Sequence, residues 1–205
     1  MSSNEKTDLK TSTEESLQHH ALRVVLIAQV IFFVTLAWCV LLVHNYDAES
    51  AGISYYGAHH RTVLIAIFGF AAAAIGLWSA SSLFRQGGFE PLAWVGLRVV
   101  AVMLILLLLT PYNEGTFLNW VHMTIGVVGA LVQLAISYLF LRRIGSTALI
   151  LGSSLQLAGG ILGAFSLPDW NFHILLYAEI IFQLGFCWCL LEGTKVWARD
   201  EVRSS

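Results

Sequence analysis

Charged residues are scarce in this sequence. Asp, Glu, Lys and Arg together make up 12% of the 205 residues, and 57% are hydrophobic, whereas about a quarter of the residues in soluble domains are charged. So few charges cannot cover a water-soluble globule, which indicates a membrane protein. The net charge of -2 also argues against a nucleic-acid partner, because such proteins carry a clustered basic face.

Cysteine pairs and cofactor motifs are also missing. The three cysteines, Cys39, Cys187 and Cys189, lie in apolar stretches, and the last two are spaced Cys-Trp-Cys instead of the Cys-x-x-Cys that is typical of redox and zinc sites. There is no phosphate-binding loop, no Gly-x-Ser-x-Gly motif and no dinucleotide-binding Gly-x-Gly-x-x-Gly. The sequence therefore predicts no disulfide framework and no cofactor.

Six apolar stretches are present, each long enough to cross the roughly 30 Å hydrocarbon core of a bilayer as a helix. They cover residues 22–45, 62–84, 92–111, 118–141, 147–167 and 172–194, with turn-forming Gly, Pro and Asn between several of them. The predicted fold is all-α: a polytopic membrane protein with six transmembrane helices in one antiparallel bundle over residues 21–195. The polar residues 1–20 are predicted to be a disordered cytoplasmic tail, and residues 196–205 a second cytoplasmic tail.

Lys and Arg are distributed unequally between the two sides of the predicted bundle. If the helices alternate in direction, one side carries only Arg61. The other side carries Lys6, Lys10, Arg23, Arg85, Arg142, Arg143, Lys195, Arg199 and Arg203. Because basic residues are retained on the cytoplasmic side, we expect a plasma (inner) membrane protein with both termini in the cytoplasm. Arg98 lies inside the third stretch, where its long side chain either reaches the cytoplasmic surface or finds a partner in the bundle.

Ionisable residues gather on the outer side once the helices are oriented. Those in or beside the outer loops are His44, Asp47, Glu49, His59, His60, Arg61, Glu114, Asp169 and His173. His122 and Glu179 reach inward from the same side, within the fourth and sixth stretches. Ionisable groups at such depth are costly and usually face a bundle interior or a wet cavity.

Buried amides extend this polar surface toward the middle of the bundle. Gln133, Gln156 and Gln183 each lie near the centre of their own helix, which predicts a hydrogen-bonded contact among the fourth, fifth and sixth helices. His122, Gln133 and Ser137 share one face of the fourth helix. We therefore expect a polar cavity open to the outer leaflet, while polar residues that only hold the helices together would show the same pattern.

The favoured interpretation is a non-catalytic protein that binds a lipid, a small polar ligand or a membrane-protein partner in this cavity, alone or as a homo-oligomer. The predicted ligand-binding residues are His122, Glu179, Gln133, Gln183, Gln156, His173 and Asp169. One alternative is a metal-dependent lipid hydrolase at the outer leaflet, with His59, His122 and His173 as zinc ligands and Glu179 or Asp169 activating water. Another is a small proton-coupled transporter that relies on Glu179.

Three segments carry a family resemblance: ISYYGAHHR before the second stretch, TPYNEGTFLNWVHM at the start of the fourth, and LYAEIIFQLGF in the sixth. Together they resemble the six-helix bacterial membrane proteins of the DUF998 type, which are similar in layout to the Frag1/DRAM group. The resemblance covers residues 22–194 and singles out Ser54, Gly57, His122 and Glu179, so it adds Ser54 to the expected ligand-binding residues. The Glu-Arg pair familiar from such proteins is Glu179-Ile180 here. The family has no assigned activity, so the resemblance implies an architecture more than a function.

Overall fold

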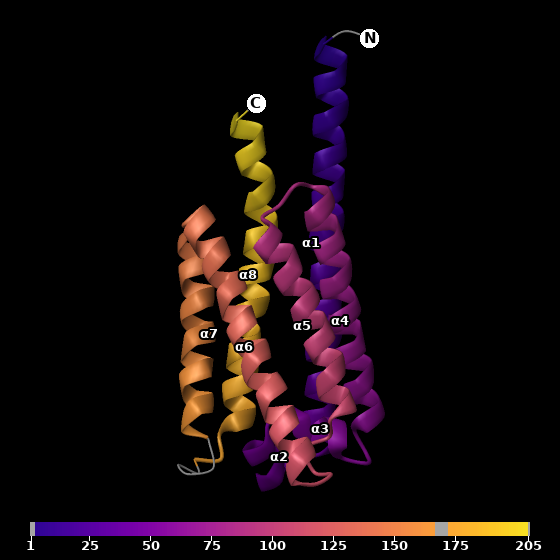
Figure 1. The fold of residues 1–205 in the computed structure, drawn as a ribbon, viewed down its shortest axis with the longest axis vertical. Coiled ribbons are helices and arrows are strands. Elements are labelled where there is room, and N and C mark those ends of the chain that lie inside the picture. Colours follow the sequence, from indigo (N-terminus) through magenta and orange to yellow (C-terminus); the bar gives the residue numbers. More distant parts are fainter. Residues whose placement is uncertain (1–2, 167–171, 205) are drawn as a thin grey trace.

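The computed structural model describes residues 3–166 and 172–204, with side chains for 16–166 and 172–195. All regular secondary structure among the described residues is helical (Figure 1). In chain order these are α1 (Ser3–Leu42), α2 (Tyr46–Ala51), α3 (Ser54–Ala58), α4 (Val63–Gln86), α5 (Pro91–Leu109), α6 (Thr116–Ile144), α7 (Thr147–Phe165) and α8 (Leu175–Ser204).

Six of these helices are long and apolar enough to cross a membrane. The spans are Ser16–Leu42, Val63–Gln86, Pro91–Leu109, Thr116–Ile144, Thr147–Phe165 and Leu175–Lys195. They coincide with the six apolar stretches to within a few residues, so the prediction of an all-α chain with six candidate spans is confirmed. Their ends follow from local chemistry. Pro91 occupies the first turn of α5, where its missing N–H costs nothing, and α6 is capped after Ile144 by Gly145, whose φ of 64° suits glycine.

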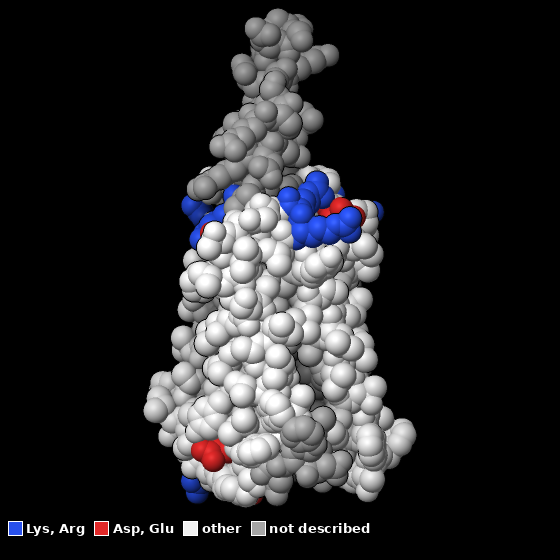
Figure 2. Space-filling view, turned by 90° about the vertical axis from the view of Figure 1, so that its left-hand side faces the viewer, with Lys and Arg blue, Asp and Glu red and all other residues white. Residues whose placement is uncertain are grey.

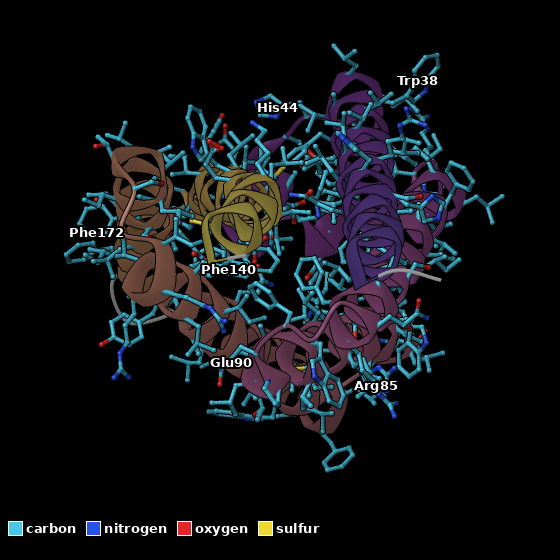
Figure 3. The ribbon with its side chains drawn as sticks, turned by 90° about the horizontal axis from the view of Figure 1, so that it is seen from above. Trp38, His44, Arg85, Glu90, Phe140 and Phe172 are labelled. Atoms are coloured by element: carbon cyan, nitrogen blue, oxygen red, sulfur yellow. The ribbon has the colours of Figure 1, made fainter. Side chains whose placement is uncertain are left out.

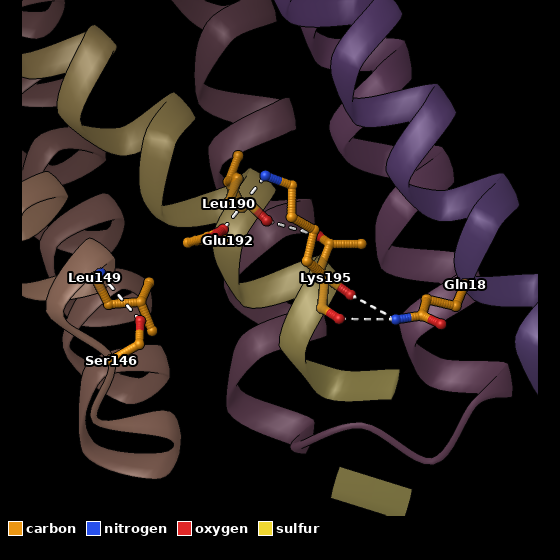
Figure 4. Close-up of polar contacts among 7 residues, drawn as sticks. Gln18, Ser146, Leu149, Leu190, Glu192 and Lys195 are labelled. Carbon is orange, nitrogen blue, oxygen red and sulfur yellow. Dashed lines mark hydrogen bonds and ion pairs between the residues drawn. The ribbon is translucent and has the colours of Figure 1, made fainter. Parts of the chain in front are cut away.

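The N-terminal part of α1 differs from the sequence-based expectation. The helix begins at Ser3, so residues 3–20, which were expected to be a disordered tail, continue the first candidate span as helix. Extending a formed helix costs far less than nucleating one, and Glu, Lys, Leu and Gln in this segment are good helix formers. Near the boundary, the Gln18 side chain donates hydrogen bonds to the carbonyls of Thr194 (3.1 Å) and Lys195 (3.2 Å), which tie α1 to α8 (Figure 4).

The long helices pack in a defined order. Neighbours in sequence contact one another, α4 beside α1, α5 beside α4, α6 beside α5 and α8 beside α7, and α8 also contacts α1 and α6. Viewed end-on, α8 lies between α7 and α1 (Figure 3). One buried cluster, around Phe84, Leu97 and Phe140, fills the end of the bundle near the two termini. A second, around Phe32 and Tyr56, fills the opposite end, which we call the distal end.

Glycines set the closest helix contact, between α7 and α8. Gly159 lies against Phe182 of α8 so tightly that a Cβ atom at this position would collide with the Phe182 backbone nitrogen. Gly185 of α8 lies equally close to the backbone of Gln156. The spacing Gly159-x-x-x-Gly163 predicts close helix packing, and Gly159 makes such a contact within the chain, against α8.

Charge is concentrated at the end that carries the termini. On the face drawn in Figure 2, Lys and Arg side chains gather around the upper rim of the described side chains, and the flank below is almost free of charge. Exposed basic residues at this end include Arg85, Arg142, Arg143 and Lys195. Arg143 pairs with Glu90 at 3.3 Å. We call this the basic end.

Candidate functional site

The distal end is crossed by the α2–α3 segment, residues 46–58, which lies opposite both termini (Figure 1). The sequence did not predict these two short helices. Asn45 begins α2 by accepting a hydrogen bond from the Ala48 backbone N–H at 2.9 Å. The rest of the segment depends on side chains of the long helices, which hold it through polar contacts.

Ser54 and His122 form the first of these contacts. His122, on α6, is 9% exposed. Its Nδ1 lies 2.6 Å from the Thr110 carbonyl oxygen, and its Nε2 lies 2.7 Å from Ser54 Oγ. A carbonyl oxygen can only accept, so Nδ1 carries the proton, and Nε2 of the neutral ring is left to accept from the Ser54 hydroxyl. The imidazole is thus fixed in one orientation, with its acceptor nitrogen toward the α2–α3 segment.

Glu179 makes the second contact. It lies one turn into α8, and its Oε2 accepts a hydrogen bond from the Ile53 backbone N–H at 2.6 Å. Gly52 precedes this amide with φ +73°, and a Cβ atom there would collide with the Glu179 carboxyl group. Glycine is therefore required at position 52 for two reasons, the backbone conformation and the space the carboxyl group occupies.

A second serine–histidine pair has the opposite hydrogen-bond polarity. Ser50 Oγ donates to the Tyr46 carbonyl at 2.8 Å and also lies 2.6 Å from His173 Nδ1. Since the hydroxyl proton is used on the carbonyl, His173 is the donor to Ser50. His173 itself has a left-handed backbone, with φ 51°. Of the two pairs, only Ser54–His122 directs a hydroxyl proton at a histidine nitrogen.

Further contacts hold α2 and the start of α3. The Tyr177 hydroxyl, on α8, donates to Glu49 Oε1 at 2.8 Å, and His44 Nε2 lies 3.4 Å from the same oxygen. Asn45 Nδ2 donates to the Tyr55 hydroxyl at 2.9 Å. The α2–α3 segment is therefore attached to α6, to α8 and to the residues between α1 and α2 through polar side chains.

Tyr56 is the exception in this segment. Its side chain is fully buried, and its hydroxyl has no hydrogen-bond partner among the described residues. Burial raises the pKa of Tyr56 to about 12, because the ionised phenolate would lose its hydration.

The predicted contact among the three central glutamines is wrong. Both amide atoms of Gln156, as well as Gln133 Oε1 and Ser137 Oγ, are buried without a partner among the described residues. The reason lies in the rotation of α8, which turns Ala178, Phe182 and Gly185 toward α7. Gln183 is one residue, about 100°, away from Phe182 around the helix and so points off that face. Glu179 and Gln183, one turn apart, do share a face.

The alternative set of zinc ligands is not assembled either. Among the described residues, no three His, Cys, Asp or Glu side chains lie close enough to hold a metal ion. His59 stacks on Tyr55 at 5.2 Å, and His122 and His173 are each committed to a different serine. Burial, together with neighbouring His60 and Arg61, lowers the pKa of His59. Asp169 lies in 167–171, outside the described residues.

Several partners in the site carry no sequence signal. The Thr110 carbonyl and the Ile53 amide are backbone groups, so no residue type marks them. Ser50, in the short helix α2, and Tyr177, in the first turn of α8, are ordinary polar residues. Ser54 was identified only through the family resemblance.

Comparison of the chain with protein-family models, curated proteins and solved structures finds no match.

Proposed function

We propose that the chain is a multi-pass protein of the plasma membrane, inserted as an antiparallel six-helix bundle with both termini in the cytoplasm and the distal end outside. The six apolar helices and the uncharged flank support insertion. The basic end, which carries Arg85, Arg142, Arg143 and Lys195, supports the orientation, because such residues are retained on the cytoplasmic side.

At the distal end, the protein binds the polar head of a lipid or a small polar ligand, and the α2–α3 segment closes the site. The observation that carries this proposal is that His122 and Glu179, the two ionisable side chains reaching inward from this end, both bond to adjacent residues of that one segment, Ser54 and Ile53. When the segment lifts, both groups lose these partners and become free to bind a ligand.

The chemistry of the two groups defines the ligand. His122 Nε2 is an acceptor, because Nδ1 is held to a carbonyl, and the Glu179 carboxyl oxygen also accepts. A ligand that replaces Ser54 and Ile53 must therefore supply O–H or N–H donors. An ethanolamine head group has an ammonium group with three donors, whereas a choline head group has none.

This difference provides the test. We expect short-chain phosphatidylethanolamine to raise the melting temperature of the purified chain in detergent, by about 5 to 10 °C at 100 times its Kd. Phosphatidylcholine with the same acyl chains should not. The variants His122→Ala and Glu179→Ala should lose the shift, and Thr124→Ala should keep it, since Thr124 is exposed on the same helix and bonds only within it. Equal shifts with both lipids, or an unchanged shift in both site variants, would contradict the proposal.

A second candidate is ester cleavage with Ser54 as nucleophile, and the polarity of the Ser54–His122 bond favours it. A serine that donates to a histidine nitrogen, with the other nitrogen held by an acceptor, has the arrangement of an activated nucleophile and its base. Ser54 Oγ would attack the ester carbonyl carbon while its proton passes to His122 Nε2. The same proton would then go to the departing alkoxide, and water would hydrolyse the acyl-serine by the reverse transfers.

Labelling with a fluorophosphonate distinguishes this candidate from simple binding. If Ser54 is a nucleophile, the wild-type chain is labelled, and Ser54→Ala is not. Ser50→Ala is the matched control, because Ser50 also lies against a histidine but gives its proton to a carbonyl, so this variant should label normally. An unlabelled wild type, or a label that survives in Ser54→Ala, removes ester cleavage and leaves the binding proposal to be decided by the lipid experiment.

A further inference from the structure

A groove lies between α4 and α5 on the outside of the bundle. Its volume is about 360 Å³, within the roughly 300–1,000 Å³ of ligand pockets. Its walls are almost entirely apolar, with Ala74 and Trp78 on α4 and Ala101 and Ile105 on α5. The two alanines make the groove deeper, because their small side chains leave space between the larger neighbouring side chains. In a bilayer, such a groove faces lipid chains.

Arg98 stands at the end of this groove. Its guanidinium carbon lies 5.1 Å from the ring centre of Trp78, which also lines the groove, and 5.3 Å from that of Trp94. Its Nε donates to Ser81 Oγ at 3.1 Å. These contacts settle the question that the sequence left open: the side chain is held by a serine and two tryptophans of α4 and α5.

The guanidinium still has unused donors. In the described part of the chain, no carboxylate lies within ion-pair distance of Arg98 or of Arg85. Arg85 lies 5.5 Å from the ring centre of Trp94, the tryptophan that Arg98 also contacts. Arg85 is exposed at the rim of the bundle (Figure 3). An arginine about two turns inside a membrane helix is expensive to leave without an anionic partner.

We propose that the α4–α5 groove binds one acyl chain of an anionic phospholipid, whose phosphate is held by Arg98 and Arg85. Trp78 joins the apolar groove to Arg98, and Trp94 joins Arg98 to Arg85. Among the described residues the order is therefore groove first and then two arginines without a carboxylate partner, toward the basic end. Phosphate oxygens suit the planar donors of arginine, and basic pockets between membrane helices at the cytoplasmic side are typical sites for anionic head groups.

The full-length chain, purified in detergent, is titrated with phosphatidylglycerol and with phosphatidylcholine of identical acyl chains, and bound lipid is counted by native mass spectrometry. Wild type should prefer phosphatidylglycerol. Arg98→Gln should reduce that preference roughly tenfold, the effect of losing a hydrogen bond to a charged group, and Arg98→Lys should retain most of it. The matched control is Arg142→Gln, an exposed arginine at the same end but on α6, which should change the preference less than about twofold.

The groove is tested separately from the charge. Val102 also lines it and is 46% exposed, so Val102→Trp should fill the groove without disturbing the core and should weaken both lipids. Leu157→Trp, at an exposed position of α7, a helix that does not line the groove, should weaken neither. Equal losses in Arg98→Gln and Arg142→Gln would show that only diffuse surface charge is involved and would overturn the proposal. So would equal binding of the two lipids by wild type, or undiminished binding in Val102→Trp.

Discussion

Replacing Glu179 in two different ways separates its acceptor role from the presence of a carboxylate. Glu179→Gln keeps an amide oxygen that can accept from the Ile53 N–H, whereas Glu179→Ala removes the acceptor. The bond is short, 2.6 Å, and Ile53 is only 6% exposed. The alanine variant therefore leaves a buried backbone donor without its partner.

The size of the effect follows from that burial. An unsatisfied buried donor costs about 1–3 kcal/mol, so Glu179→Ala should make local opening of the α2–α3 segment about 5 to 150 times more frequent. Glu179→Gln exchanges one acceptor for another and should cost less than about 1 kcal/mol, under about fivefold.

Hydrogen exchange of the peptide that contains Ile53 measures this opening directly, because amide protection reports the free energy of local unfolding. Glu192→Ala is the matched control: Glu192 is on the same helix, at the basic end, where it pairs with Lys195 at 3.4 Å (Figure 4). It should leave exchange in residues 46–58 unchanged. If the Ile53 amide exchanges as slowly in Glu179→Ala as in wild type, the Glu179 contact does not hold the segment. The reasoning about a closed distal site then fails as well.

Three other outcomes follow from the packing. Gly159→Ala should destabilise the chain by about 1–3 kcal/mol in detergent unfolding, since its Cβ has no room against α8, whereas Gly126→Ala, with open space around it, should be neutral or slightly stabilising. Tyr56→Phe removes a buried hydroxyl that has no partner among the described residues and should stabilise by about 1 kcal/mol or more. Burial raises the folded-state pKa of Tyr56 to about 12, against about 10 when unfolded. Wild-type stability should therefore also fall as pH rises from about 10 to about 12, and this fall should be smaller in the variant. A double-mutant cycle of Ser54→Ala and His122→Ala should show a coupling of about 0.5–1.5 kcal/mol, and zero coupling would mean that their hydrogen bond contributes nothing to stability.

Hydropathy alone predicted the six long helices, because a stretch of about 20 apolar residues has few structures open to it in a bilayer. It could not predict α2 and α3. Helices of six and five residues are unstable in isolation, and these two are held by Glu179, His122 and Tyr177, which come from helices distant in sequence. The first helix was predicted too short for a related reason: composition signals disorder, but a polar segment attached to a formed helix can continue it.

From the sequence, only those residues of the candidate site could be predicted that are unusual at their depth inside a membrane helix. His122 and Glu179 stood out because ionisable groups are rare inside membrane helices, and the structure directs both at the α2–α3 segment. The glutamine contact failed because periodicity defines the faces of one helix without saying how each helix is turned toward its neighbours. For α7 and α8, that rotation is set by Gly159 and Gly185.

The two ends of the bundle call for opposite ligand chemistry, and this allows one more prediction. At the distal end, His122 and Glu179 present acceptors, whereas at the basic end, Arg98 presents donors only. The groups lie on different helices and share no hydrogen-bond partner among the described residues, so their effects on lipid binding should add independently. Arg98→Gln should leave the stabilisation by short-chain phosphatidylethanolamine intact, and His122→Ala should leave the preference for phosphatidylglycerol intact. If either variant abolishes both effects, the two lipids share one site, and the assignment of acceptors to one head group and donors to the other is wrong.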